Sequence, residues 1–154
     1  MTRPEPRDYV LGQELTVRIL TTAAQTSGRH DLVYAFQLPD TVTPLHLHTR
    51  YEERLFVVAG VCTVWVGPDT VRLGPGDYCA IALNTAHAIK AGPEGCRSLL
   101  ISSPAGFAEL ITRVATPAHL AGPDTEIDLE LFASVSAELG DQILGPPGTL
   151  PAGR

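Results

Sequence analysis

The stretch that decides the fold runs Pro44-Leu-His-Leu-His-Thr-Arg-Tyr-Glu-Glu-Arg-Leu-Phe-Val-Val-Ala-Gly60. His46 and His48 are two residues apart, a spacing that places both side chains on one face of a β-strand. On a helix the same spacing would turn the two rings about 200° away from each other. Glu53 has the opposite strand parity to the histidines, so the three side chains converge only if the chain bends between His48 and Glu53.

Strand patterns surround this stretch on both sides and are separated by turn residues. The chain has 154 residues, of which 14 are Gly and 13 are Pro, and most of these fall between short apolar runs. Short strands at intervals of about 8–12 residues predict a sandwich or a barrel. We interpret the apolar segment Leu55–Pro68 as two buried strands that turn at Gly60. This segment is shorter than the about 20 residues that a membrane-spanning helix needs. The predicted strands cover residues 14–21, 31–38, 55–59, 61–66, 70–73, 78–83, 86–90 and 97–102.

After Ser103 the apolar pattern changes to a helical period. One helix is indicated by Phe107, Leu110, Ile111 and Val114. A second helix fits residues 129–139, with Asp128 as its N-cap and Gly140 as its stop. We therefore predict one domain, in which residues 1–103 form a β-barrel with its core at 10–102. Residues 104–154 form a helical extension of that barrel, with an irregular tail from Gly145.

Charge and thiol content narrow the class of protein. The net charge is −6, and the 11 basic residues are scattered singly, whereas nucleic-acid binders carry a basic patch. The three cysteines, Cys62, Cys79 and Cys96, have no CxxC spacing and indicate reduced thiols in a cytosolic protein. The mixed charges and prolines at the N-terminus do not fit the apolar core of a signal peptide. We expect a cytoplasmic protein without a nucleic-acid or membrane partner.

Paired imidazoles on one strand face are good ligands for a divalent transition metal. His87 lies on a later predicted strand and can supply a third imidazole, with Glu53 as the carboxylate. Structural zinc sites typically include Cys, so this set favours an open site over a closed one. The ligand types leave the metal open among Fe, Mn, Ni, Co, Cu and Zn.

These residues resemble the two motifs of the cupin superfamily. The first motif has His-x-His, three or four residues, Glu, six residues and Gly, which His46, His48, Glu53 and Gly60 match. The second motif runs from a Gly to the third His, here Gly76 and His87. The chain departs from the pattern at turn positions and at the final Asn, where it carries Asp40, Ala82, Asn84 and Ala91.

The resemblance implies an all-β jelly-roll barrel, also called a double-stranded β-helix, with a C-terminal α-helical extension. It also implies that His46, His48, Glu53 and His87 are the metal ligands, and that the protein forms a homodimer. A single barrel with such an extension is similar to bacterial quercetin 2,3-dioxygenase-like proteins. By that resemblance, the protein would insert O₂ into a flavonol or another enolisable aromatic small molecule, with Glu53 as the base. A redox-neutral cyclase or isomerase acting on a polyketide-like substrate and a non-catalytic small-molecule-binding cupin remain alternatives.

Four aromatic residues on the predicted strands are candidates for the substrate pocket, because small β-barrels can hold one ligand. Packing in the core is the alternative interpretation of the same residues. The four are Tyr34, Phe36, Phe56 and Trp65.

Overall fold

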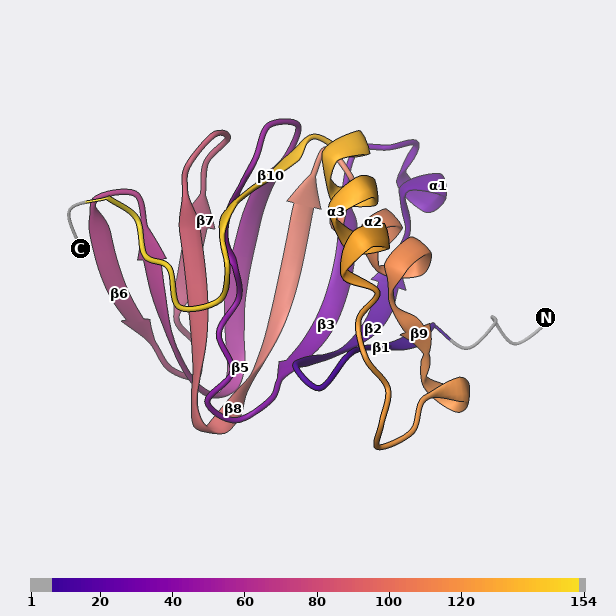
Figure 1. Cartoon of the computed structure of the whole chain (residues 1–154). Helices are drawn as coiled ribbons and strands as arrows, with labels where there is room; N and C mark the ends of the chain where they lie inside the picture. The colour runs from indigo at the N-terminus through magenta and orange to yellow at the C-terminus, as the bar shows by residue number, and fades with distance from the viewer. Residues whose placement is uncertain (1–6, 153–154) are drawn as a thin grey trace.

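The computed structural model describes residues 7–152 and is mainly β, with 49% of the chain in strands and 17% in helices. Figure 1 shows the strands curving into a barrel, with the helices gathered on one side. This arrangement confirms the predicted mainly β jelly roll with a helical C-terminal segment. The strands are β1 (Asp8–Leu11), β2 (Leu15–Thr21), β3 (Asp31–Gln37), β4 (Leu45–His48), β5 (Glu52–Val66), β6 (Asp69–Leu73), β7 (Tyr78–Ile81), β8 (His87–Ser103), β9 (Thr116–Pro117) and β10 (Asp141–Gly145). The helices are α1 (Ala23–Thr26), α2 (Phe107–Val114), the 3₁₀ helix η1 (Ala118–Leu120) and α3 (Leu129–Glu138).

Two long strands, β5 and β8, belong to both layers of the barrel. The first part of β5 pairs with the second part of β8, and the second part of β5 pairs with the first part of β8. The layer that contains β3, β2 and β1 continues from the second part of β8. The other layer contains β4 and β10, which join the first part of β8 through a pairing of His46 with His87.

The prediction of a turn at Gly60 is wrong, because β5 runs unbroken from Glu52 to Val66. The strand instead bends at this point, where its register against β8 shifts between Val57 and Ala59 and again between Gly60 and Cys62. Residues 92–95 of β8 lie at the same bend, between Ala91, which pairs with Cys62, and Cys96, which pairs with Gly60. Glycine-rich bulges of this kind let a strand pass from one layer to the next.

The C-terminal segment returns to the barrel. Asp128 caps α3, where its carboxylate accepts a hydrogen bond from the Leu131 amide at 3.0 Å. Directly after α3, β10 pairs antiparallel with β4, a strand that the sequence pattern did not predict. Figure 1 shows α3 and β10 next to each other along the barrel. Residues 1–6 and 153–154, which end the two predicted segments, lie outside the described residues.

The core lies between the two layers and is built from alternate residues of each strand. Val33 and Ala35 of β3 and Leu55 and Val57 of β5 are buried in it. Cys62, Cys79 and Cys96 are free thiols, and Cys62 and Cys96 are buried. Within residues 7–152, no helix is both long and apolar enough to span a membrane.

Substituting Gly60 with Ala should destabilise the protein by about 3 kcal/mol, because φ is +76° and a Cβ would lie 2.2 Å from the Gly95 carbonyl oxygen. Gly28 is a matched control, since its φ is +77° and a Cβ there would meet nothing within 4 Å. Ala at position 28 should therefore cost only about 1 kcal/mol, the backbone contribution. Chemical denaturation of both variants measures the difference, and equal losses would show that the bend tolerates a side chain.

Candidate metal centre

The four predicted ligands come from three strands, β4, β5 and β8, and β8 pairs with both of the others. His46 and His48 lie on β4, His87 begins β8 and Glu53 lies near the start of β5. Residues 49–51 form a bend between β4 and β5, which brings Glu53 to the histidines despite its opposite parity. Convergence of Glu53 with the two histidines requires this bend, and the structure contains it.

The ligand atoms of these four side chains all lie within 4.8 Å of one another. Oε2 of Glu53 is 3.2 Å from Nε2 of His48 and 3.2 Å from Nε2 of His87. Glu53 and His48 are only 6% and 5% exposed, and His87 is fully buried. The three imidazole rings therefore face one carboxylate in a site largely shielded from solvent.

In each of the three histidines, the ring nitrogen Nδ1 forms a hydrogen bond with an oxygen atom. Nδ1 of His46 donates to the Pro44 carbonyl at 2.7 Å, and Nδ1 of His87 donates to the Thr85 carbonyl at 2.8 Å. Nδ1 of His48 lies 2.7 Å from the Asp141 carboxylate. Because each of these oxygens accepts a proton at Nδ1, the three Nε2 atoms are directed inward, as in metal sites whose outer shell orients the ligands.

Asp141 is the functional residue that the sequence analysis missed. It begins β10, where it pairs with His48 across the sheet, and it is 7% exposed. It lies 93 residues beyond His48 in the chain. No local pattern around Asp141 signals that contact, because the pairing of β10 with β4 depends on how the whole C-terminal segment packs.

The buried carboxylate and imidazoles of the cluster shift one another's pKa values. Burial alone would raise the pKa of Glu53, but hydrogen bonds from His48 and His87 and their charges hold it well below its ordinary value. Burial opposes the charged form of His48 too, yet hydrogen bonds to Asp141 and Glu53 raise its pKa to about 9. Burial, together with the charges of His87 and His48, lowers the pKa of His46 to about 3. Metal binding at His48 requires release of its ring proton.

The cluster could bind a metal ion, as is typical of cupins. Three nitrogen donors with fixed tautomers and one ionised carboxylate, all within a few ångströms, fit the preferences of a divalent transition metal. The metal is not identified by this donor set.

The buried side chain of Tyr51 packs against the cluster at His48. Its ring stacks on that of His48, with centroids 4.3 Å apart and planes inclined by 24°, and it is 2% exposed. Gly106 packs against this ring so closely that a Cβ there would lie 2.4 Å from it. Tyr51 and Gly106 therefore hold the plane of His48.

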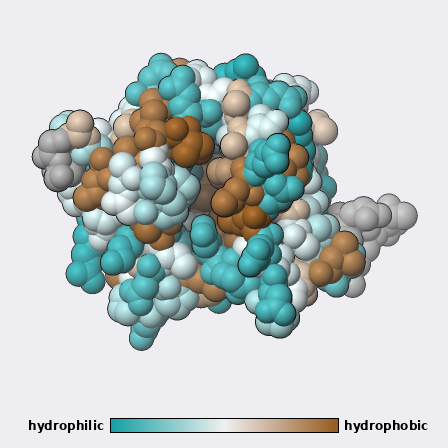
Figure 2. All heavy atoms as spheres, in the orientation of Figure 1, coloured by the Kyte–Doolittle hydropathy of each residue, from teal (hydrophilic) through white to brown (hydrophobic). Residues whose placement is uncertain are grey.

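A cavity of about 410 Å³ opens from the cluster and is lined largely by apolar side chains. His46, His48 and Glu53 form part of its wall. The C-terminal segment forms another part, through Leu129, Phe132, Ala133 and Ser136 of α3 and through Ile143, Pro146 and Pro147. Figure 2 shows a hollow in this face of the molecule, flanked by hydrophobic side chains. Among the described residues, no Lys or Arg lines the cavity.

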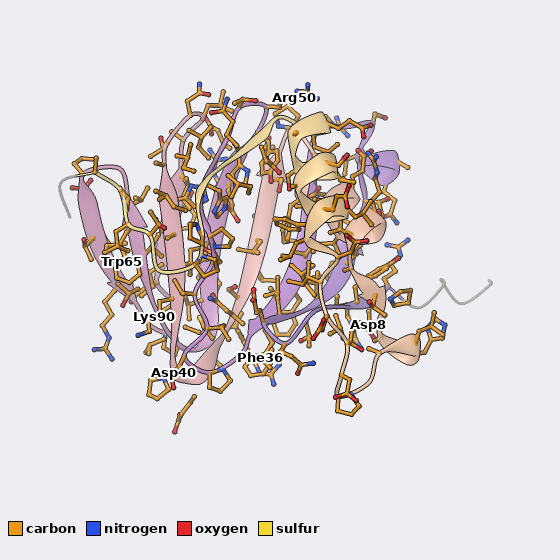
Figure 3. All side chains as sticks on the ribbon, viewed as in Figure 1. Asp8, Phe36, Asp40, Arg50, Trp65 and Lys90 are labelled. Atoms are coloured by element: carbon orange, nitrogen blue, oxygen red, sulfur yellow. The ribbon has the colours of Figure 1, made fainter. Side chains whose placement is uncertain are left out.

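The four aromatic residues proposed for the pocket are not among the residues that line this cavity. Tyr34 and Phe36 alternate with the buried Val33 and Ala35 and so face the outside of β3. The same alternation turns Phe56 outward, where it is 41% exposed, and turns Trp65 away from the buried Val64. Figure 3 shows Phe36 and Trp65 away from the centre of the barrel. Strand parity therefore turns these four aromatic residues away from this cavity.

The comparisons with known proteins agree with the fold seen in the structure. Residues 36–102 match the family described as the cupin domain. This match and the jelly-roll fold support assignment to the cupin superfamily. No curated protein matches the chain at a significant level.

Solved cupin structures resemble the chain in fold. Ectoine synthase from P. lautus matches 100% of this chain and 96% of its own, with a TM-score of 0.60 and 17% identity. KdgF from Halomonas sp. matches 67% of this chain and 85% of its own, with a TM-score of 0.53 and 21% identity. Streptomyces PAC13, solved with uridine, matches 68% and 84%, with a TM-score of 0.55 and 14% identity. At these identities the likeness establishes the fold and leaves the reaction open.

Proposed function

We propose that the protein is a metal-dependent enzyme that acts on an enolisable, largely apolar small molecule. One observation carries this proposal: the cluster of His46, His48, Glu53 and His87 lies at the wall of a largely apolar cavity. Among the described residues, no Lys or Arg lines that cavity. A substrate that relied on a remote carboxylate or phosphate would lack a cationic partner there. An aromatic or polyketide-like molecule with an oxygen donor fits the same surface.

The reaction needs two functions, one that holds the substrate oxygen and one that accepts its proton. A bound divalent transition metal would supply Lewis acidity, which favours the deprotonated form of a coordinated substrate oxygen. Glu53 lines the cavity and is ionised, so it can accept the proton when the O–H bond of an enol or phenol breaks. The apolar walls exclude water from this step.

Within this class, we propose O₂ insertion into a flavonol or another enolisable aromatic as the first reaction to test. The quercetinase-like resemblance of the sequence and the apolar cavity support it. A redox-neutral cyclisation or isomerisation is the second candidate. Ectoine synthase from P. lautus shares this fold and aligns with the whole chain, α3 and β10 included, which supports testing a reaction other than O₂ insertion.

Oxygen consumption separates these reactions. Protein loaded in turn with Fe, Mn, Ni, Co, Cu or Zn is mixed with flavonols and polyketide phenols in an oxygen electrode, and each mixture is repeated under argon. We expect O₂ uptake that depends on both metal and substrate. Product formed under argon without uptake would favour the redox-neutral enzyme. Ligand binding without product in either atmosphere would contradict an enzymatic role and favour a binding protein.

A further inference from the structure

The cavity contains a second polar region, formed by Gln37 and Glu14. Gln37 ends β3 and pairs with Leu15 of β2, and the Leu38 amide donates to the Glu14 carbonyl at 2.9 Å. These contacts place Gln37, at the end of β3, beside the turn residue Glu14, which directly precedes β2. Both residues line the cavity.

The amide of Gln37 is fixed so that only its oxygen is free. Its Nε2 donates to the carbonyls of Thr41 and Ile89, each at 3.0 Å, which uses both amide protons. Within residues 7–152, the Oε1 atom accepts no hydrogen bond. Because Nε2 is anchored on two sides, Gln37 presents a hydrogen-bond acceptor whose orientation cannot flip.

Glu14 adds a second acceptor without a partner. Its carboxylate forms no hydrogen bond or ion pair with the described part of the chain, although the residue is partly buried. Burial raises the pKa of this carboxyl above its ordinary value. The turn that carries it is held in place, since Gln13 donates to the carbonyls of Pro123 and Thr125, each at 3.0 Å. The Glu14 carboxylate is therefore available to accept a hydrogen bond from a ligand in the cavity.

We propose that Gln37 and Glu14 form a subsite that recognises a hydrogen-bond donor, a hydroxyl or amino group, on the substrate. The subsite lies a short distance from the metal cluster, because Gln37 contacts Ile89, two residues beyond His87 on β8. Two strand residues span roughly 7 Å along β8, so the amide of Gln37 is anchored within two residues of His87. The substrate would then be an apolar ring system with an oxygen donor at the cluster and a donor group at the far side. This inference rests on the proposed function only in taking the cavity as the substrate site.

Phenol and anisole test the subsite without any turnover. They share an apolar ring, but only phenol carries a donor. Titration of ¹⁵N-labelled protein followed by NMR should show that phenol binds about 5–10 times more tightly than anisole and shifts the side-chain amide signals of Gln37. Equal affinities in the wild-type protein, or no phenol binding, would overturn the inference.

Two variants test whether Gln37 and Glu14 cause the preference for phenol over anisole. In Gln37→Met and in Glu14→Met, the preference for phenol should fall below about twofold. Glu14→Met removes no side-chain hydrogen bond of the described structure, so it remains informative if Gln37→Met fails to fold. Leu15→Met is the matched control, because Leu15 lines the same region and carries no acceptor, and it should keep the wild-type preference. A preference that persists in both acceptor variants would contradict the subsite. The oxygen and argon assays do not enter this test, so the two proposals can fail separately.

Discussion

Replacing Glu53 with Gln should leave most of the bound metal in place and lower turnover by about 10²–10⁴-fold. The amide has the same shape and can still contribute an oxygen to the cluster, but it cannot accept a proton at neutral pH. His46, His48 and His87 remain as nitrogen donors in the variant. Elemental analysis gives the metal content, and steady-state kinetics on the substrate found in the panel gives the turnover.

Glu52→Gln is the matched control for this prediction. Glu52 is the neighbouring residue, its side chain is 44% exposed, and it pairs with Arg54 at 3.0 Å outside the cavity. Metal content and turnover should both stay within about twofold of the wild-type values, as expected for an exposed ion pair. Normal turnover in a metal-loaded Glu53→Gln protein would refute the role of Glu53 as the base.

Replacing Asp141 with Asn should weaken metal binding by about 10–100-fold, although Asp141 does not belong to the ligand set. The carboxylate lies 2.7 Å from Nδ1 of His48, and both side chains are buried. Loss of its charge makes the ring a poorer electron donor at Nε2 and loosens the choice of tautomer. Competition with a chelator measures the affinity, and ¹⁵N NMR of the imidazole reports the tautomer of His48.

The control for Asp141→Asn is Asp128→Asn in the same C-terminal segment. Asp128 caps α3, and Asn caps helices about as well as Asp does, so this variant keeps the segment folded. Its metal affinity should match that of the wild-type protein. Wild-type metal affinity in Asp141→Asn would show that the contact with His48 holds β10 in place without tuning the site.

Local sequence patterns predict much of this molecule. The strand pattern predicts β2 and β3 closely, and the apolar spacing at Phe107, Leu110, Ile111 and Val114 predicts α2. The spacing of His46, His48, Glu53 and His87 predicts a cluster that the structure brings together. These features depend on residues close in the chain, or on a motif whose spacing reflects one geometry.

Two of the features that were missed, Asp141 and the bend at Gly60, depend on contacts that are distant in the chain. Asp141 reaches His48 only because the chain returns after α3 as β10. Gly60 allows a turn as readily as a bend, and only the pairing of β5 with β8 decides between them. The outward positions of Tyr34 and Phe56 follow from strand parity, which neighbouring residues already indicated but aromatic character obscured.

The passage of β5 and β8 through both layers has a consequence for how the molecule folds. The two layers cannot separate unless β5 and β8 lose their pairing near the middle of each strand. We therefore expect no stable intermediate in which only one layer is folded. We expect a single cooperative unfolding transition with coincident fluorescence and circular dichroism curves. Because β5 pairs with residues of β8 that lie 21 to 51 positions away, folding should be slow compared with that of a helical protein of similar length.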